Sequence, residues 1–120
     1  MQTEMNEDLS LIIKEIIRFR DDRDWLQFHD PKNLVQAISI EAAELQEIFL
    51  WKSTDDSKNL PSNEIKRVEN EAADIFIFMI YLCNHFGIDL LEAVQKKLKT
   101  NKLKYPVEKS RGTSKKYNEL

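Results

Sequence analysis

Residues 33–51, NLVQAISIEAAELQEIFLW, decide the fold class of this chain. Their apolar side chains recur at the spacing of one helix face, so we expect a helix over about residues 31–52. One position in that face breaks the apolar pattern, because it holds Glu41. Burying a carboxylate is costly unless a proton or an opposite charge neutralises it. The complete stripe consists of Leu34, Ile38, Glu41, Leu45 and Ile48.

The same helical spacing continues outside this segment and predicts an all-α fold. We expect further helices over about residues 6–22, 62–86 and 89–104, joined in part by the polar, proline-containing loop KSTDDSKNLPSN. No stretch shows the alternation of polar and apolar residues that is typical of a strand. The chain holds only two glycines and three prolines, which also favours long helices over turns.

Residues with known capping preferences mark the ends of these helices. Asp30 stands directly before a proline and suits the start of the helix that follows it. Ser62 or Asn63 could cap the next helix, and Asp89 could cap the last one. Gly87 is expected to end the helix before it, because glycine readily adopts the left-handed conformation found there.

Length and composition are those of an ordinary globular protein, and we expect one domain over residues 1–120. The net charge of −3 argues against duplex nucleic acid as a partner. The single cysteine, Cys83, excludes an internal disulfide and is expected to be buried and unreactive. No apolar run approaches the roughly 20 residues that a membrane span needs. We therefore expect a cytoplasmic protein with no membrane partner and with a basic tail over about residues 105–120.

A second pair of acids interrupts the apolar stripe of the expected 62–86 helix. In the 31–52 helix, Glu44 follows Glu41 by three positions. Asp74 follows Glu71 at the same spacing, and residues three apart are neighbours on a helix surface. The chain therefore reads E-x-x-E, then 26 residues, then E-x-x-D. The stripe that the second pair enters consists of Val68, Glu71, Ile75, Phe78 and Leu82.

Four carboxylates on buried helix faces would repel one another, and a divalent cation is the simplest means of neutralising them. Carboxylates without histidine or thiolate favour Mg²⁺, Mn²⁺ or Ca²⁺. Alternatively, these acids lie on solvated faces or pair with basic residues from elsewhere. A di-iron site is disfavoured, because neither His29 nor His85 has a glutamate three positions before it. The glutamates with no comparable position, which we expect at the surface, are Glu47, Glu64 and Glu69.

Several blocks of the chain, taken with this acid pattern, resemble the MazG-like all-α nucleoside triphosphate pyrophosphohydrolases, and among them the dCTP pyrophosphatase branch. The similarity covers about residues 15–120. The motif RDW-x-Q-F-H, the tryptophan after the acidic helix and the closing R-G-x-x-x-K-Y make it specific. The similar blocks are FRDDRDWLQFHDPKNL, IEAAELQEIFLWK, NEAADIFIFMIYL, GIDLLEAV and KYPVEKSRGTSKKYNEL.

The resemblance implies a four-helix-bundle-like fold of the MazG type that hydrolyses a nucleoside triphosphate to a monophosphate and pyrophosphate. It implies Mg²⁺ as the cofactor, with Mn²⁺ as a possible substitute, and a homo-oligomer in which a neighbouring subunit completes the active site. The oligomer would be a dimer or a tetramer of two dimers. The residues that match the metal ligands are Glu41, Glu44, Glu71 and Asp74. Glu41 or Glu44 is expected to orient the attacking water or to accept its proton.

Aromatic and cationic residues are expected to contact the nucleotide. Trp25 and Trp51 match positions that flank the base in the dCTP branch, although core packing is the commoner fate of tryptophan. Phe78 stands where that branch commonly has tyrosine, and it lacks a hydroxyl that could bond base or sugar. Tyr105 and Tyr117 offer the basic tail apolar anchors, against the alternative of a solvated end. The remaining expected contacts are Asn101, Lys104, Tyr105, Arg111 and Lys116.

We therefore predict a magnesium-dependent nucleoside triphosphate pyrophosphatase that acts on dCTP or a modified dCTP and clears unwanted nucleotides from the pool. The alternative among enzymes is a dUTP-type or broad-specificity dNTP pyrophosphatase on the same fold. The alternative outside enzymes is a non-catalytic helical module for metal binding or oligomerisation. His29 could bind a phosphate or stabilise its own loop.

Overall fold

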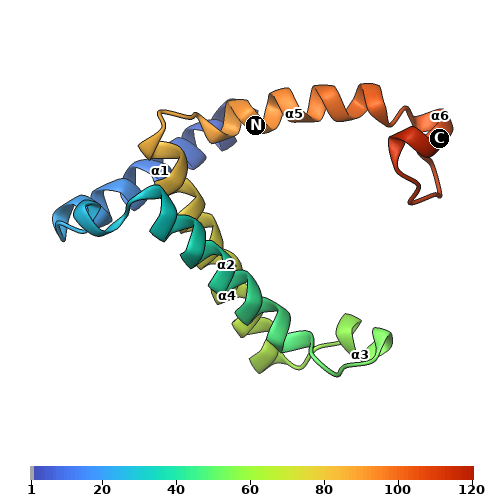
Figure 1. Cartoon of the computed structure of the whole chain (residues 1–120), viewed down its shortest axis with the longest axis horizontal. Coiled ribbons are helices and arrows are strands. Elements are labelled where there is room, and N and C mark those ends of the chain that lie inside the picture. The colour runs from blue at the N-terminus through green and yellow to red at the C-terminus, as the bar shows by residue number, and fades with distance from the viewer. Residues whose placement is uncertain (1) are drawn as a thin grey trace. The chain divides into compact units, whose positions relative to one another are not determined.

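The computed structural model describes residues 2–120, with side chains at 4 and from 7 onward (Figure 1). The described residues contain helices and turns but no strand, so the all-α prediction is confirmed. The chain divides into two compact units, Met1–Gly87 and Ile88–Leu120. The expectation of one domain over residues 1–120 stays a prediction.

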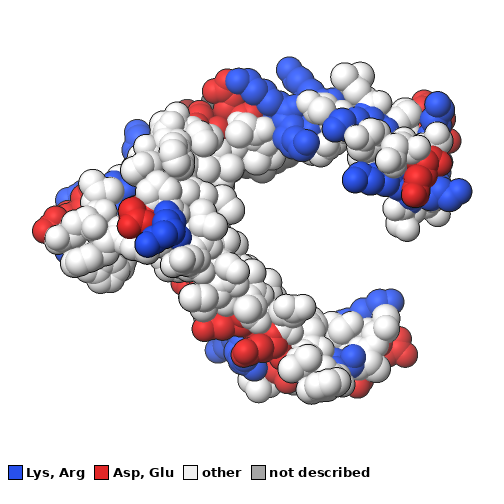
Figure 2. Space-filling view, in the orientation of Figure 1, with Lys and Arg blue, Asp and Glu red and all other residues white. Residues whose placement is uncertain are grey.

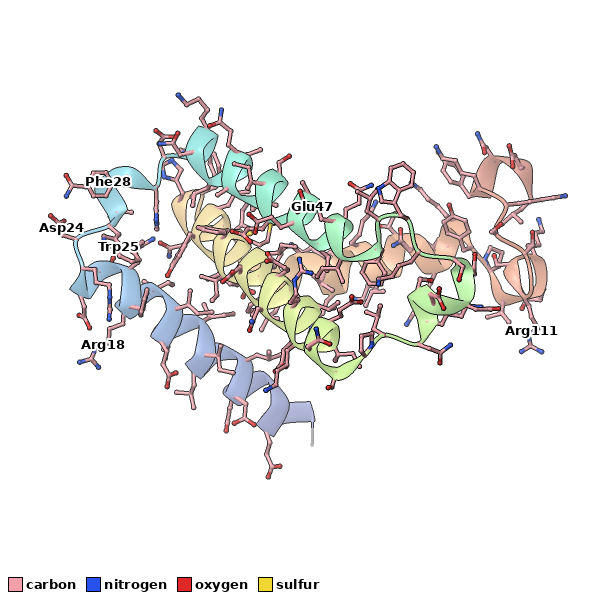
Figure 3. The ribbon with its side chains drawn as sticks, turned by 90° about the horizontal axis from the view of Figure 1, so that it is seen from below. Arg18, Asp24, Trp25, Phe28, Glu47 and Arg111 are labelled. Carbon is pink, nitrogen blue, oxygen red and sulfur yellow. The ribbon has the colours of Figure 1, made fainter. Side chains whose placement is uncertain are left out.

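Two long helices, α2 and α4, lie side by side in the first unit and form most of its contacts (Figures 1 and 3). A third, α1, packs against α4. The elements of this unit are α1 (Gln2–Asp22), the 3₁₀ turn η1 (Leu26–Phe28), α2 (Pro31–Phe49), α3 (Thr54–Lys58) and α4 (Ser62–His85). Apolar side chains from α2 and α4 fill the centre. The fully buried ones are Leu34, Ile48, Ile80, Tyr81 and Cys83. On α2 the buried residues Leu34 and Ile48 belong to the predicted stripe, whereas on α4 the predicted stripe is only half-buried and the buried residues lie beside it.

Side-chain caps begin two of the predicted helices. The Asp30 carboxylate accepts a hydrogen bond of 2.8 Å from the backbone N–H of Asn33, and Asp89 accepts one of 3.1 Å from that of Glu92. The prediction that Ser62 or Asn63 caps α4 is wrong. Pro61 occupies the cap position with an extended ψ of 158°, and Ser62 already belongs to the first helical turn.

The chain leaves both long helices through a left-handed residue. After α4, Gly87 has a φ of +66°, as expected of a glycine that ends a helix. A Cβ at Gly87 would meet no atom within 4 Å, so torsion rather than space requires glycine there. After α2, the same role falls to Trp51, whose φ is +65°. The helix therefore ends at Phe49, earlier than the predicted residue 52.

The segment between α2 and α4 is more ordered than the predicted loop, because it contains the short helix α3. The Ser53 hydroxyl accepts a hydrogen bond of 3.1 Å from the backbone N–H of Asp56 and so caps this helix. Lys52 and Glu64 then join the two ends of the segment through an ion pair. The first turn of α4 is thereby attached to the residue that follows Trp51.

The second unit contains α5 (Leu90–Lys104), α6 (Val107–Ser110) and the 3₁₀ turn η2 (Tyr117–Glu119). The tail folds back on the end of α5, because the rings of Tyr105 and Tyr117 meet edge to face at 6.1 Å. The Lys104 ammonium lies 4.7 Å from the centre of the Tyr117 ring. These contacts confirm that the two tyrosines anchor the tail.

Charge is divided unevenly between the two units. Residues 88–120 hold nine lysines and arginines against four acids, a formal charge of +5, whereas residues 1–87 carry −8. Basic side chains accordingly gather over α5 and the tail in Figure 2. Within residues 2–120, no single helix is long and apolar enough to cross a membrane, and only α4 and α5 counted together would pass on length and composition.

Candidate active site

The two acid pairs lie at the middle of the contact between α2 and α4. Glu41 and Glu44 come from α2, and Glu71 and Asp74 come from α4. Carboxylate oxygens of Glu41, Glu44 and Glu71 lie within 4.8 Å of one another. Glu41 and Glu71 are half-buried, whereas Glu44 and Asp74 are exposed. The structure thus brings three of the four predicted ligands together and leaves Asp74 at the edge of the cluster.

The surroundings of Glu41 raise its pKa from its ordinary 4.5 to about 7. The largest cause is the hydrogen bond that its protonated carboxyl makes with Glu71, followed by burial. The charges of Glu44, Glu71 and Asp74 add to the shift. Asp74 therefore acts on the cluster electrostatically although it lies outside the group of three.

The cluster also holds polar atoms without partners. One oxygen each of Glu41 and Glu71, in both cases Oε2, is buried and forms no hydrogen bond with any residue that the structure describes. Of the described side chains, no lysine or arginine forms an ion pair with the four acids. Buried carboxylate oxygens of this kind are the ligands that Mg²⁺ and Mn²⁺ prefer, so the residues present fit a divalent cation.

Trp51 follows the helix that carries Glu41 and Glu44, and its backbone has an unfavourable conformation, with a φ of +65°. The left-handed region costs a non-glycine residue roughly 1–2 kcal/mol, and the Trp51 side chain is 94% exposed. The cost is therefore not recovered by burial of the ring. Seven residues, or two helical turns, separate Trp51 from Glu44, which corresponds to about 10 Å along the helix axis. Strain of this kind at a solvent-facing aromatic is typical of a residue kept for binding.

Glu64, expected at the surface, is instead half-buried, so that prediction is wrong. Its carboxylate forms an ion pair of 2.9 Å with the Lys52 ammonium, and the side chains are only 23% and 24% exposed. The pair was missed because it joins residues on opposite sides of α3, and no helical period relates them. Glu47, labelled on α2 in Figure 3, and Glu69 are exposed as predicted.

Trp25, labelled in Figure 3, precedes α2 in the chain, whereas Trp51 follows it. Its ring is 42% exposed and meets the ring of Phe19 at 5.6 Å and that of His29 at 6.5 Å. The 19 residues of α2 span about 28 Å between the two tryptophans. One base cannot therefore contact both rings of the same chain.

A buried arginine supports the end of the unit that carries Trp25. Arg20 is only 4% exposed, donates a hydrogen bond of 3.0 Å to Asn84 Oδ1 and pairs with Asp21 at 2.9 Å. Its guanidinium lies 5.5 Å from the centre of the Tyr81 ring, and the Tyr81 hydroxyl donates a hydrogen bond of 2.9 Å to the Ile16 carbonyl. The only signal in the sequence was that Arg20 falls at a helical spacing from the apolar residues of α1.

His29 completes this aromatic stack, because its ring lies 5.0 Å from that of Tyr81. Burial, followed by the Arg20 charge, lowers the pKa of His29. Its Nδ1 atom is buried without a hydrogen-bond partner among the described residues. These contacts favour a role in stabilising the loop over direct contact with a phosphate. Cys83 is buried, as predicted, and burial raises the pKa of its thiol, which keeps it unreactive.

The remaining predicted contacts divide between the units. Phe78 is half-buried on α4, one turn after Asp74. The other five belong to the second unit, where they follow one another along α5 and the tail. They are Asn101, Lys104, Tyr105, Arg111 and Lys116.

A model of the MazG-like family matches residues 36–120, a segment that contains both acid pairs. The chain belongs to the MazG-like family. Among curated relatives, it is 39% identical to the mouse (Mus musculus) dCTP pyrophosphatase 1 and 36% identical to the human (Homo sapiens) one. Each match covers 85% of this chain and 61% of the relative, so the chain spans less than two thirds of their length.

A solved structure has a similar fold. A pyrophosphatase from Archaeoglobus fulgidus is 44% identical, with a TM-score of 0.72, over 85% of this chain and 93% of the other. The MazG-like resemblance and the all-α fold predicted from the sequence are thereby confirmed.

Proposed function

We propose that this chain is a magnesium-dependent nucleoside triphosphate pyrophosphatase that converts a dNTP to its monophosphate and pyrophosphate. The observation that carries the proposal is the meeting of Glu41, Glu44 and Glu71 with buried oxygens that lack partners. The names of the relatives support the same class of reaction, since they are called pyrophosphatases. The role would be to clear unwanted nucleotides from the cytoplasmic pool.

Glu41, Glu44, Glu71 and Asp74 would hold the cation. A divalent cation bound there neutralises the triphosphate and lowers the pKa of water. Glu41 and Glu44 are the side chains that would orient the attacking water, and either can accept its proton.

The leaving pyrophosphate needs positive charge, for which basic residues of α5 and the tail, of this chain or of a neighbouring subunit, are the candidates. Lys104, Arg111 and Lys116 are the cations that we assign to this task, and the +5 charge of residues 88–120 supports it. Asn101 and Tyr105 would add hydrogen bonds to the phosphates. The edge-to-face contact of Tyr105 with Tyr117 folds the exposed tail back on the end of α5.

The substrate that we favour is dCTP or a modified dCTP, on the strength of relatives named dCTP pyrophosphatase. Trp51 offers the base a flat exposed ring, and stacking is worth about 1–3 kcal/mol per base. Phe78 provides no hydroxyl near the acids, so a dUTP-type or broad dNTP specificity is the competing proposal.

The active enzyme would be a homo-oligomer, either a dimer or a tetramer of two dimers. Trp25 and Trp51 stand at opposite ends of α2, so rings that flank one base would have to come from different chains. The neighbouring subunit would thereby complete the active site. Light scattering of the purified protein measures the oligomeric state, and a monomer with full activity would contradict this part of the proposal.

One assay tests the reaction itself. The purified protein is incubated with each nucleoside triphosphate, with magnesium or with a chelator, and the products are separated. Monophosphate and pyrophosphate, formed only with the metal and fastest from dCTP, are the expected result. Diphosphate and phosphate would indicate another hydrolase. An absence of turnover would favour a non-catalytic metal-binding module.

A further inference from the structure

The left-handed conformation of Trp51 is unusual for a residue with a large side chain. Gly87 takes the equivalent left-handed position after α4, where its φ is +66° and any larger residue would be strained. Trp51 has nearly the same φ, +65°, with a large side chain. Its ring is exposed, so packing of the indole does not hold the backbone in place.

Backbone hydrogen bonds close the turn that contains Leu50 and Trp51, but they do not reach α4. The N–H of Leu50 donates to the Glu47 carbonyl at 3.2 Å, and the N–H of Lys52 donates to the Phe49 carbonyl at 3.1 Å. Both acceptors belong to the last turn of α2. They leave the direction in which the chain continues toward α4 undetermined.

The Lys52 side chain supplies the missing connection. Its ammonium lies 2.9 Å from Glu64 Oε2 and donates a hydrogen bond of 3.2 Å to Oε1 of the same carboxylate. Glu64 lies in the first turn of α4, where the helix dipole favours a negative charge. Both side chains are about three quarters buried, so solvent screens this pair less than a surface pair.

We propose that Lys52 and Glu64 are positioning residues whose ion pair holds Trp51 in the left-handed conformation that presents its indole to the base. The effect on nucleotide binding rests on the proposed function, whereas the effect on the order of Trp51 does not. Breaking the pair frees the residue after Trp51, so the ring samples other orientations and stacks on the base less often.

The first measurement follows Trp51 without substrate. In a Trp25→Phe background, Trp51 is the only tryptophan of the chain. Time-resolved fluorescence anisotropy should show faster and wider motion of this indole after Lys52→Met or Glu64→Gln. Lys52→Arg keeps the charge and should restore the original decay, as should the exchange Lys52→Glu with Glu64→Lys.

The second measurement follows the reaction with both tryptophans present. Lys52→Met should raise KM for the best triphosphate about fivefold or more, which corresponds to the lower limit of base stacking, while kcat changes less than twofold. Arg18→Met is the matched control, because it removes an ion pair with Asp22 whose side chains are 82% and 61% exposed. This control should leave both anisotropy and KM unchanged.

The outcomes separate the two ideas. An unchanged anisotropy decay in a folded Lys52→Met variant would overturn the positioning role, and so would a faster decay with an unchanged KM. If the wild-type chain hydrolyses no triphosphate, the proposed function fails, and the anisotropy comparison still decides whether the ion pair orders Trp51. Circular dichroism identifies any variant that has lost its helices, and in that case Glu64→Gln replaces it.

Discussion

Glu41 on α2 and Glu71 on α4 face each other across the helix contact, and each keeps one buried carboxylate oxygen without a hydrogen-bond partner among the described residues. Two carboxylates in this relation cannot both be ionised without a compensating charge. They either share a proton, which raises the pKa of Glu41 to about 7, or they share a cation. The first two predictions below describe the cluster without a cation and with one.

Without metal, the raised pKa of Glu41 makes stability depend on pH. The folded state keeps the proton between about pH 4.5, the ordinary value, and about pH 7, whereas the unfolded state releases it. The contribution of Glu41 to the free energy of unfolding is therefore fully present below pH 4.5 and is lost as pH rises through 7. Urea denaturation in chelator should show this loss in the wild type and not in Glu41→Gln. The difference should be on the order of 1 kcal/mol, because solvent screens a half-exposed carboxylate. Equal pH profiles for the two proteins would contradict the prediction.

Removal of one carboxylate charge from the cluster should lower the affinity for the cation more than it lowers the stability of the fold. We expect Glu41→Gln and Glu71→Gln each to lower the affinity for Mg²⁺ or Mn²⁺ at least tenfold and nearly to abolish hydrolysis. Titration calorimetry and product analysis measure these effects, and circular dichroism should show intact helices. Glu69→Gln is the control, since Glu69 is exposed on the same helix and outside the cluster. A Glu69→Gln variant that lost as much affinity would show that the effect is one of total charge.

Trp51→Gly should make the protein more stable and should weaken its binding of the nucleotide. Glycine relieves the left-handed strain but adds backbone entropy to the unfolded state, so the net gain should be about 0.5–1 kcal/mol. Thermal denaturation measures this gain, and a higher KM for nucleotide should accompany it. Gly87→Ala is the reverse experiment and should destabilise by about 1 kcal/mol, since its φ is +66° and no atom obstructs a Cβ. A loss of stability in Trp51→Gly would show that the indole packs in the folded protein.

The hydroxyl of Tyr81 should contribute to stability but not to the metal site. Tyr81→Phe removes the hydrogen bond of 2.9 Å to the Ile16 carbonyl, and we expect a loss of about 0.5–1.5 kcal/mol. The affinity for metal should stay unchanged, because Tyr81 lies two turns beyond Asp74 on α4. The measurement is urea denaturation, with the partly exposed Phe76→Leu as a control for aromatic substitution on the same helix. A variant as stable as the wild type would mean that water replaces the bond fully.

The acid cluster was predictable because a helix repeats its faces at a fixed interval. Glu41 and Glu71 each interrupt an apolar stripe, and their carboxylates meet where α2 and α4 pack together. The α-helical class and the cap at Asp30 follow from equally local signals. Sequence reasoning identifies such sites whenever the functional residues share the period of the element that carries them.

The features that were missed depend on how elements pack. Arg20 and Asn84 are 64 positions apart, and Lys52 and Glu64 are 12 apart with a short helix between them. No period relates the members of either pair. The conformation of Trp51 was missed for a related reason, since a tryptophan gives no local signal for a positive φ. Pairs of this kind become visible only once the helices are placed side by side.

The division of charge at Gly87 has a consequence for handling the protein. The sequence pI is about 5.4, so the whole chain migrates as an anion at neutral pH, while its last 33 residues remain cationic. A polyanion such as heparin will meet a local charge of +5 despite the overall repulsion, and it will release the chain as salt screens that attraction. Retention on such a column is therefore expected to depend mainly on residues 88–120.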